Sequence, residues 1–243
     1  MKRAGRIGGF LAFTNIGFPL MVGAMTQHMV IAIDGPAASG KGTLARKLAA
    51  ELGFAYLDTG ALYRCVGKAV LDAGGNPADE SAAIVAAKSL QQTLKPQDLQ
   101  NPDLRTDTVG SAASNVAKFP AVRQALFEFQ RNFAKTPQQG YGGVILDGRD
   151  IGTVIAPDAD VKLFVTASVE ERTKRRLAEL TGKGIETDFE TVLADMKQRD
   201  ERDSARDTAP LKPADNAVLV DTSTMDAQSV MDYALSLIRN RAS

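Results

Sequence analysis

The chain has 243 residues, which is long enough for one α/β domain with an insert or for two small domains. Its hydrophobic share of 44% is ordinary for a globular protein, and its formal net charge of zero argues against broad binding to nucleic acid or to acidic membranes. Any cationic site must therefore be a local cluster. The single cysteine, Cys65, cannot form an intramolecular disulfide, so we expect it to pack within a helix and expect a reducing, cytoplasmic compartment.

Residues 1–28 differ in composition from the rest of the chain. Basic residues precede an apolar, glycine-rich run at 7–24, an order that resembles a secretory signal. A membrane-spanning helix is a weaker alternative, because glycines and a proline interrupt a run of marginal length. Since the lone cysteine suits a reducing compartment, we expect residues 1–28 to be an extension that is disordered or reflects an upstream start codon. The folded domain then covers residues 29–243.

The first predicted element is a strand at 29–34, which leads into the glycine-rich loop GPAASGKGT and a helix at about 41–52. A strand before and a helix after distinguish a phosphate-binding loop (P-loop) from a chance glycine-rich turn. In such a loop the backbone N–H groups converge on one point, the helix N-terminus adds partial positive charge, and Lys41 supplies a mobile full charge. We predict that nucleotide phosphates bind along this loop, at Gly35, Pro36, Ala37, Ala38, Ser39, Gly40, Lys41, Gly42 and Thr43.

The end of this loop departs from the commonest pattern. Gly42 follows the lysine, and the hydroxyl comes one residue later, at Thr43. The ending GKGT resembles nucleoside monophosphate kinases more than GTPases or motor ATPases. It weakens the expectation that the Thr43 hydroxyl ligates Mg²⁺ directly.

Further along the chain, apolar periodicity and turn residues predict strands that alternate with helices. The expected strands lie at 54–57, 144–147, 161–165 and 217–221, and the expected helices at about 61–73, 79–92, 107–117, from 120, at about 168–180, from 187 and at about 226–239. Residues 74–106 are polar and alanine-rich, and we predict a short, mostly helical or looped insert there. The whole pattern indicates an α/β fold of the P-loop NTPase type, with a five-stranded parallel sheet and helices on both faces.

Local patterns add detail to three of these helices. The pairs Ser168 with Glu171, and Thr187 with Glu190, have the spacing of capping boxes. Inward-facing stripes are expected at Val122, Leu126, Phe129 and Phe133, and at Phe189, Val192, Leu193 and Met196.

Charged residues collect in three segments. In DTGALYR, Thr59 is placed to cap a helix, and Arg64 could reach a phosphate near the strand ends. In LDGRDIG, at 146–152, two carboxylates and an arginine follow a buried strand. A tight turn with a local ion pair is the alternative there. We predict a site instead, because α/β proteins meet their ligands at the carboxyl ends of strands.

The third segment is RDERDSARD, at 199–207. If its helix continues, Arg199, Asp203 and Arg206 share one face. Solvated salt bridges worth about 0.3–0.5 kcal/mol each are the alternative. We favour a second anion site, because phosphoryl transfer between anionic substrates needs several cations and the planar arginine fork binds phosphate oxygens in pairs. A vaguer cluster, expected to be solvated or associated with a lid, comprises Arg172, Arg175 and Arg176.

Five segments together resemble the bacterial cytidylate (CMP) kinases, and they occur in that family's order from residue 29 to about 240. They are GPAASGKGT, LDTGALYR, SAASNVAKFPAVR, LDGRDIGTVIAPDADVKLFV and RDERDSARDTAPL. The P-loop alone is weakly specific, whereas DGRD-x-GT followed by RD-x-RD-x-x-R is strongly specific. Many family members carry a longer insert with a small sheet, for which residues 74–106 are too short and too polar.

The resemblance implies transfer of the γ-phosphoryl group of ATP to CMP or dCMP with Mg²⁺. It implies catalytic roles for Lys41, Arg149 and Arg206, a CMP-phosphate site at Arg64, Arg149 and Arg206, cytosine readers at Ser114, Arg123 and Asp150, ribose contacts at Arg199 and Asp203, and a further substrate contact at Thr59. Asp147 is expected to contact Mg²⁺ through water, with no direct protein ligand. We also expect a lid at about 176–190, small nucleotides as the partners, no nucleic acid or membrane partner, and a monomer.

The residue types agree with cytosine as the base. A carboxylate such as Asp150 can accept a hydrogen bond from the exocyclic amine, and arginine and serine donors suit the N3 and O2 acceptors. Uracil would present O4 to the same carboxylate and is disfavoured.

Two alternatives stay open at this point. One is another small-acceptor P-loop kinase, for AMP, UMP or shikimate, which initial rates across acceptors would separate. The other is a regulatory protein that binds ATP and transfers nothing. Production of ADP only when a nucleoside monophosphate is present would exclude this second alternative.

Overall fold

The structure is a computed structural model and describes residues 28–242, so the predictions for residues 1–27 lie outside it. The strands are β1 (Met29–Asp34), β2 (Ala55–Asp58), β3 (Gly143–Gly148), β4 (Val161–Thr166) and β5 (Val218–Asp221). The α-helices are α1 (Lys41–Leu52), α2 (Thr59–Asp72), α3 (Glu80–Thr93), α4 (Asp107–Val116), α5 (Pro120–Lys135), α6 (Val169–Gly182), α7 (Phe189–Ser204) and α8 (Ala227–Ala242). Two 3-10 helices, η1 (Pro96–Gln100) and η2 (Pro102–Arg105), and a π-helix, η3 (Ile151–Ile155), complete the described elements.

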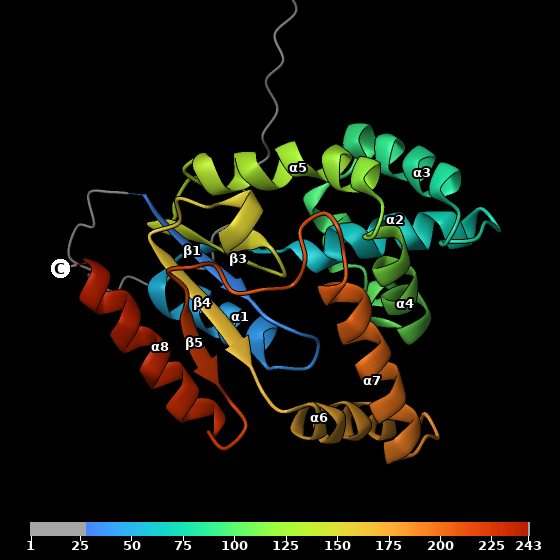
Figure 1. The fold of residues 1–243 in the computed structure, drawn as a ribbon. Coiled ribbons are helices and arrows are strands. Elements are labelled where there is room, and N and C mark those ends of the chain that lie inside the picture. The colour runs from blue at the N-terminus through green and yellow to red at the C-terminus, as the bar shows by residue number, and fades with distance from the viewer. Residues whose placement is uncertain (1–27, 243) are drawn as a thin grey trace, which may run out of the picture.

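The five strands form one parallel sheet in the order β2-β3-β1-β4-β5, which confirms the predicted fold class. β1 lies in the centre, with β3 on one side and β4 on the other (Figure 1). The chain therefore leaves the carboxyl end of β1 at the point where the strand order reverses. In open α/β sheets this crevice is where ligands bind.

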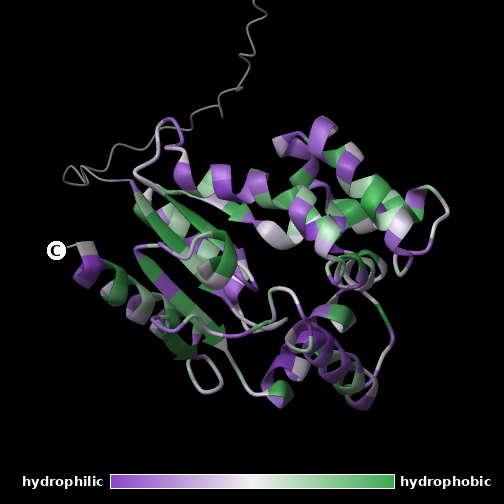
Figure 2. Cartoon of the chain, turned by 45° about the horizontal axis from the view of Figure 1, so that its top comes forward, coloured by the Kyte–Doolittle hydropathy of each residue, from purple (hydrophilic) through white to green (hydrophobic). Residues whose placement is uncertain are grey.

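Helices cover both faces of the sheet. On one face, α1 and α8 pack against Ile31, Ile33 and Leu163, all of them buried. On the other face, α5 and η3 cover Val144 and Leu146. Figure 2 shows the strands mostly in green, the colour of hydrophobic residues, which is the expected composition of strands buried on both faces.

A second apolar cluster joins α2, α3, α4 and α5 beside the sheet (Figure 1). Leu62, Val116 and Val122 are buried in it. Residues 74–106 contribute α3 and the two 3-10 helices, and no strand is present in this described stretch. Cys65 is buried in α2, as predicted from its position in a helix.

The remaining pair, α6 and α7, packs together after the carboxyl end of β4 (Figure 1). Its small core comprises Leu180, Val192 and Met196, with Ala37 of the P-loop packed against them. In Figure 2 these two helices are mostly purple, in agreement with their many charged residues. Among the described residues, no helix is both long enough and apolar enough to span a membrane.

Several local predictions were wrong. In α5, Phe129 is 39% exposed, and Arg123 and Gln130 take the inward face beside Leu126. Apolar periodicity cannot detect this, because two polar residues occupy buried positions. His28, just before β1, is half-buried, and its Nε2 donates to Ala134 O over 3.0 Å.

The helix caps also differ from the prediction. Asp58, rather than Thr59, caps α2, and Asp188, rather than Thr187, caps α7 by accepting from Thr191 N over 2.9 Å. Aspartate is a better N-cap than threonine. Asp58 lies one residue before the predicted cap of α2, and Asp188 lies one residue after the predicted cap of α7. Ser168 caps α6 as predicted, accepting from Glu171 N over 3.2 Å.

Candidate active site

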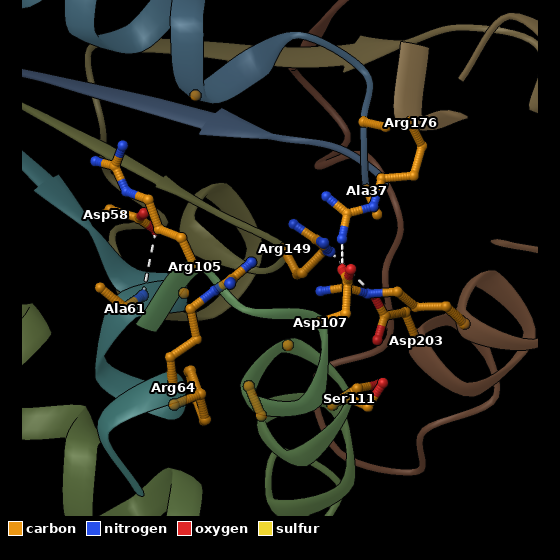
Figure 3. A pocket seen from close by; sticks show the side chains of 18 of the residues that line it. Ala37, Asp58, Ala61, Arg64, Arg105, Asp107, Ser111, Arg149, Arg176 and Asp203 are labelled. Atoms are coloured by element: carbon orange, nitrogen blue, oxygen red, sulfur yellow. Dashed lines mark hydrogen bonds and ion pairs between the residues drawn. The ribbon is translucent and has the colours of Figure 1, made fainter. Parts of the chain in front are cut away.

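One large cleft, with a volume of about 830 Å³, opens at the carboxyl end of the sheet. The P-loop and the segments after β2 and β3 form its floor, α2 and α4 line one side, and α6 and α7 line the other. Figure 3 shows arginine and aspartate side chains from these elements turned into this space. All the predicted site residues line it except Gly35 and Pro36, at the start of the P-loop.

The P-loop backbone curls tightly before α1. Gly40, the N-cap of α1, has φ +89°, and Ala38 has φ +57°, a left-handed conformation that costs a non-glycine residue free energy. Gly35 has no room for a side chain, because a Cβ there would lie 1.9 Å from Val165 O. This geometry turns the loop's N–H groups toward the space in front of α1, which is the arrangement of an anion site.

Lys41 and Asp147 form the polar floor beside the loop. Their Nζ and Oδ1 atoms are 3.9 Å apart, and Lys41 Nζ also donates to Pro36 O over 3.3 Å. Burial lowers the pKa of Lys41 to about 8, with Arg149 adding repulsion. Burial likewise raises the pKa of Asp147 to about 6, although Lys41 opposes the shift. A bound anion would restore the full charge of the lysine by replacing its lost hydration.

The position of Gly42 explains the unusual GKGT ending. A Cβ at Gly42 would lie 2.9 Å from Asp147 Oδ2. Any larger residue after the lysine would therefore push the aspartate off the floor of the cleft. Asp147 Oδ1 is buried and has no hydrogen-bond partner in residues 28–242.

Asp203 of α7 holds two arginines. Arg149 Nε donates to its Oδ2 over 3.0 Å, and Arg206 Nη2 donates to its Oδ1. Burial alone would raise the pKa of Asp203, but Arg149, Arg206 and Arg199 overcome this effect and hold the pKa below its usual range. α7 ends at Ser204, so Arg206 reaches the group from the following turn, and the predicted shared helix face holds only for Arg199 and Asp203.

Arg199 and Arg64 complete a set of four arginines, which we call the arginine cluster: Arg64, Arg149, Arg199 and Arg206. Burial lowers the pKa of Arg199 to about 10, and repulsion from Arg149 adds to the shift. Its Nε is buried without a hydrogen-bond partner in the described chain, as is Nε of Arg206. Arg64 donates to Leu104 O over 2.7 Å. Unpaired buried donors beside unneutralised cations are the electrostatic signature of an anion site.

A second buried ion pair joins Arg123 of α5 to Asp150, which follows β3. Arg123 also donates to Ala117 O over 3.3 Å and lies 5.4 Å from the centre of the Tyr63 ring. Ser114 Oγ, on the same side of the cleft, is buried with no partner among the residues described. The three side chains predicted to read a base are therefore together, and Tyr63 forms a flat surface next to them.

Comparison with known proteins settles the family. The family model described as Cytidylate kinase matches residues 31–240. The chain belongs to the cytidylate kinase family. A cytidylate kinase of Paramagnetospirillum magneticum is 58% identical over 212 residues, which cover 87% of this chain and 98% of that protein. A cytidylate kinase of Rhodospirillum rubrum is 54% identical over 214 residues, covering 88% and 99% of the two chains.

Among solved structures, an uncharacterized protein from Eubacterium ventriosum aligns with a TM-score of 0.51 at 16% sequence identity. The alignment covers 87% of this chain and 99% of that one. At this identity the likeness supports only the fold. Membership of the cytidylate kinase family identifies the chain as an enzyme of the kinase type.

Asp34 supports this site without lining the cleft, and the sequence patterns did not single it out. It is the last residue of β1 and only 4% exposed, and its two carboxylate oxygens accept from Ile151 N and Gly152 N over 2.8 Å each. Burial raises the pKa of Asp34 to about 7. Asp34 thus ties the strand that leads into the P-loop to the loop that carries Arg149 and Asp150. The sequence feature that could have identified Asp34 was its position at the carboxyl end of a predicted strand.

The expectation for the arginines of α6 was also wrong in part. Arg172 is 5% exposed and makes an ion pair with Asp200 of α7, so it is not solvated. Arg175 donates to Thr222 O over 2.6 Å. Arg176 pairs with Asp107 of α4 across the mouth of the cleft, an interaction drawn in Figure 3.

Proposed function

We propose that this enzyme transfers the γ-phosphoryl group of ATP to CMP or dCMP, producing ADP and CDP or dCDP. The observation that carries the proposal is the placement of two anion sites in one cleft. The P-loop with Lys41 lies on the floor, and the arginine cluster faces it from α2, α7 and the segment after β3. Two polyanions bound there would meet end to end, which is the geometry that phosphoryl transfer requires.

The transfer itself needs no covalent enzyme intermediate. An oxygen of the CMP phosphate attacks the γ-phosphorus while the bond to the β–γ bridging oxygen breaks, and ADP leaves with that electron pair. Charge neutralisation and alignment supply most of the rate acceleration. We assign alignment of the transferred group to Lys41, and binding of the CMP phosphate to Arg64, Arg149 and Arg206.

Base selection is assigned to Ser114, Arg123 and Asp150. Asp150 Oδ2 is engaged by Arg123, which leaves Oδ1 to accept from the exocyclic amine of cytosine. The buried Ser114 hydroxyl can serve an acceptor of the base edge. Arg199 and Asp203 are assigned to the ribose. Thr59 keeps its assignment as a substrate contact, and its Oγ1 also donates to Asp147 O over 2.8 Å, which ties the start of α2 to the end of β3.

The residues present fit a magnesium ion. Asp147 offers a buried oxygen without a partner next to the P-loop, and Mg²⁺ is bound by one or two carboxylates together with substrate phosphates and water. When bound, the ion would neutralise the phosphate charges. We assign Asp147 to contact this ion through water, and we keep Thr43 outside the direct ligands.

The same proposal covers the remaining parts of the chain. Residues 29–243 form one kinase domain, with a monophosphate-binding insert at about 74–106 and a lid at about 176–190 that excludes water during transfer. The site is complete within one chain, which supports a monomer. ATP as the phosphoryl donor and a single, unpaired cysteine support a cytoplasmic location.

The test is a panel of acceptors measured with the full chain and, in parallel, with protein that starts at Met25. We expect ADP production with CMP and dCMP to exceed that with UMP and AMP by at least about 100-fold in kcat/KM. Equal rates with all acceptors, or with none, would contradict the proposal. ADP release without any acceptor would favour an ATPase instead.

A further inference from the structure

Two arginines of α6 contact the outer side of the P-loop. Arg172 Nη1 donates to Ala37 O over 3.3 Å, and Arg175 Nη1 donates to Ser39 O over 3.4 Å. They lie on either side of Ala38, the residue held at φ +57°. The inner side of the loop presents N–H groups to the cleft, so its carbonyl groups point outward and need donors. The α6 arginines supply them.

Arg172 differs from Arg175 in what else it binds. Its Nη1 and Nη2 donate to the two carboxylate oxygens of Asp200, over 3.1 Å and 2.6 Å, and its Nε donates to Ala167 O over 2.9 Å. One side chain therefore joins the P-loop, the end of β4 and α7. Arg175 instead donates to the Oγ1 and O atoms of Thr222, after β5, and makes no hydrogen bond to α7 within residues 28–242.

Asp200 is placed on α7 where it can control two residues of the site. Its neighbour Arg199 and its near neighbour Asp203 both line the cleft, and Val192 and Met196 precede it on the buried stripe at four-residue spacing. The stripe that packs α7 on α6 thus ends in a carboxylate. Hydrophobic contacts allow a helix to slide and turn by small amounts, whereas a bidentate pair fixes one register.

We propose that Arg172 is a positioning residue, which holds α7 in register with the P-loop through Asp200 and so sets Arg199 and Asp203 against the bound ATP. The proposal rests on the kinase function proposed above. It is separate from substrate binding by Arg172 itself, because Arg172 does not line the cleft. Lysine cannot replace it, since a single ammonium group lacks the planar fork that serves a carboxylate and two carbonyl groups together.

Loss of this link should affect transfer more than binding of either nucleotide alone. The P-loop retains its own donors, so ATP affinity should change by less than about threefold, whereas a misplacement of about 1 Å between the two anion sites lowers kcat by about 100-fold. In Arg172→Met, the affinity for CMP should be the same with and without a bound unreactive ATP analogue, because the link through Arg172 between the two nucleotide sites is lost.

The experiment compares Arg172→Met, Arg172→Lys, Asp200→Asn and the double variant Arg172→Met/Asp200→Asn in the full chain. Measurements are kcat and KM for each nucleotide, equilibrium binding of each nucleotide, and the thermal midpoint, with assays run well below it. We expect kcat to fall about 100-fold for Arg172→Met, without recovery in Arg172→Lys, and about 10-fold for Asp200→Asn. The double variant should be no slower than Arg172→Met, since the two residues act as one unit.

Lys174→Met is the matched control, because Lys174 lies on the same helix in an exposed ion pair with Glu171 and should change kcat less than twofold. The proposal is overturned if Arg172→Met and Asp200→Asn keep kcat within threefold of the wild type, or if their effects multiply in the double variant. If Arg172→Met does not fold, the kcat values of Asp200→Asn and Arg172→Lys test the proposal instead. Asp200 is only partly buried, so its substitution should be tolerated by the fold. If wild-type protein prefers another acceptor, the proposed function fails, and the same ratios measured with that acceptor still test the positioning role.

Discussion

Two regions of the cleft bind anions by different means. The P-loop, here called the P-loop wall, uses backbone N–H groups, and its requirements are conformational: room at Gly35 and Gly42, and left-handed backbone at Ala38 and Gly40. The arginine cluster, here called the arginine wall, uses charged side chains, and its requirements are electrostatic. Its four arginines come from α2, the segment after β3, α7 and the turn after α7, and Asp203 holds two of them.

This difference has consequences for the effect of mutations. A backbone site is damaged by added atoms, because the donors themselves cannot be removed. A side-chain site is damaged by removed atoms, and the loss of an acid matters as much as the loss of an arginine, since an unpaired buried cation is costly. Substitutions on the two walls should therefore separate into effects on ATP and effects on CMP.

The largest expected effect is on the arginine wall. Arg149→Ala and Arg206→Ala should each lower kcat/KM for CMP by about 1000-fold, because each removes a cation next to the transferred phosphoryl group. ATP affinity should stay within about threefold of the wild type. Steady-state kinetics with both substrates and a titration of ATP alone measure the two effects.

Lys68→Ala is the control for these variants, since it removes an exposed ion pair with Asp72 outside the cleft. Wild-type turnover in either arginine variant would refute the clamp on the CMP phosphate. Loss of ATP binding to the same extent as CMP turnover would show that the two walls are not separate.

A smaller effect is expected from an added methyl group on the P-loop wall. Gly42→Ala places a Cβ 2.9 Å from Asp147 Oδ2, so the carboxylate must move, and kcat/KM for ATP should fall by about 10- to 100-fold. Gly142→Ala, whose Cβ would meet only Phe54 at an ordinary 3.4 Å, serves as the control. Unchanged ATP kinetics in Gly42→Ala would mean that Asp147 has no part in the ATP site.

The P-loop wall could be predicted from the sequence almost completely. Strand, loop and helix are contiguous, so β1 and α1 were placed at the residues that the structure shows. The five-stranded parallel sheet followed from the alternation of strands and helices. The strand–loop–helix unit is determined by local sequence, because its backbone pattern lies within a few residues. The strand pairing is not local, since β1 pairs with β3 more than a hundred positions away, and the alternation predicted only the number and direction of the strands.

The arginine wall could be predicted as a set of residues, but its contacts could not. Arg149 and Asp203 are 54 positions apart, and Arg172 and Asp200 are 28 apart. No local pattern pairs acids with arginines across such separations, and Arg172 was therefore placed only in a cluster expected to be solvated or associated with a lid. Asp34 was missed on the same ground, since its partners at 151 and 152 lie more than a hundred positions away.

The smallest expected effect concerns the link between the walls at Asp34. The folded protein keeps the proton of this carboxyl up to about pH 7, whereas the unfolded chain releases it near pH 4. The free energy of unfolding should therefore fall as the pH rises between these values, by about 1.4 kcal/mol per pH unit from this group at most. The Asp34→Asn variant has no proton to release at this position, so its free energy of unfolding should fall less steeply as the pH rises.

Urea unfolding of the wild type and of Asp34→Asn at pH 5, 6 and 7 measures the difference between the slopes. Asp147 titrates in both proteins, so the comparison reports Asp34 together with its electrostatic coupling to Asp147 and Asp150. Equal slopes would show that Asp34 is ionised throughout this range.

The uneven distribution of charge has a kinetic consequence. Cationic side chains outnumber carboxylates among the residues that line the cleft, while the whole chain is formally neutral, so the rest of the chain carries the opposite net charge. A concave positive region inside a weakly negative exterior attracts small polyanions toward its mouth and repels them elsewhere. Since ions screen such fields over about 8 Å at physiological ionic strength, added salt should slow the capture of both nucleotides before it alters any contact inside. Diffusion of nucleotides toward this protein is therefore directed by its fold.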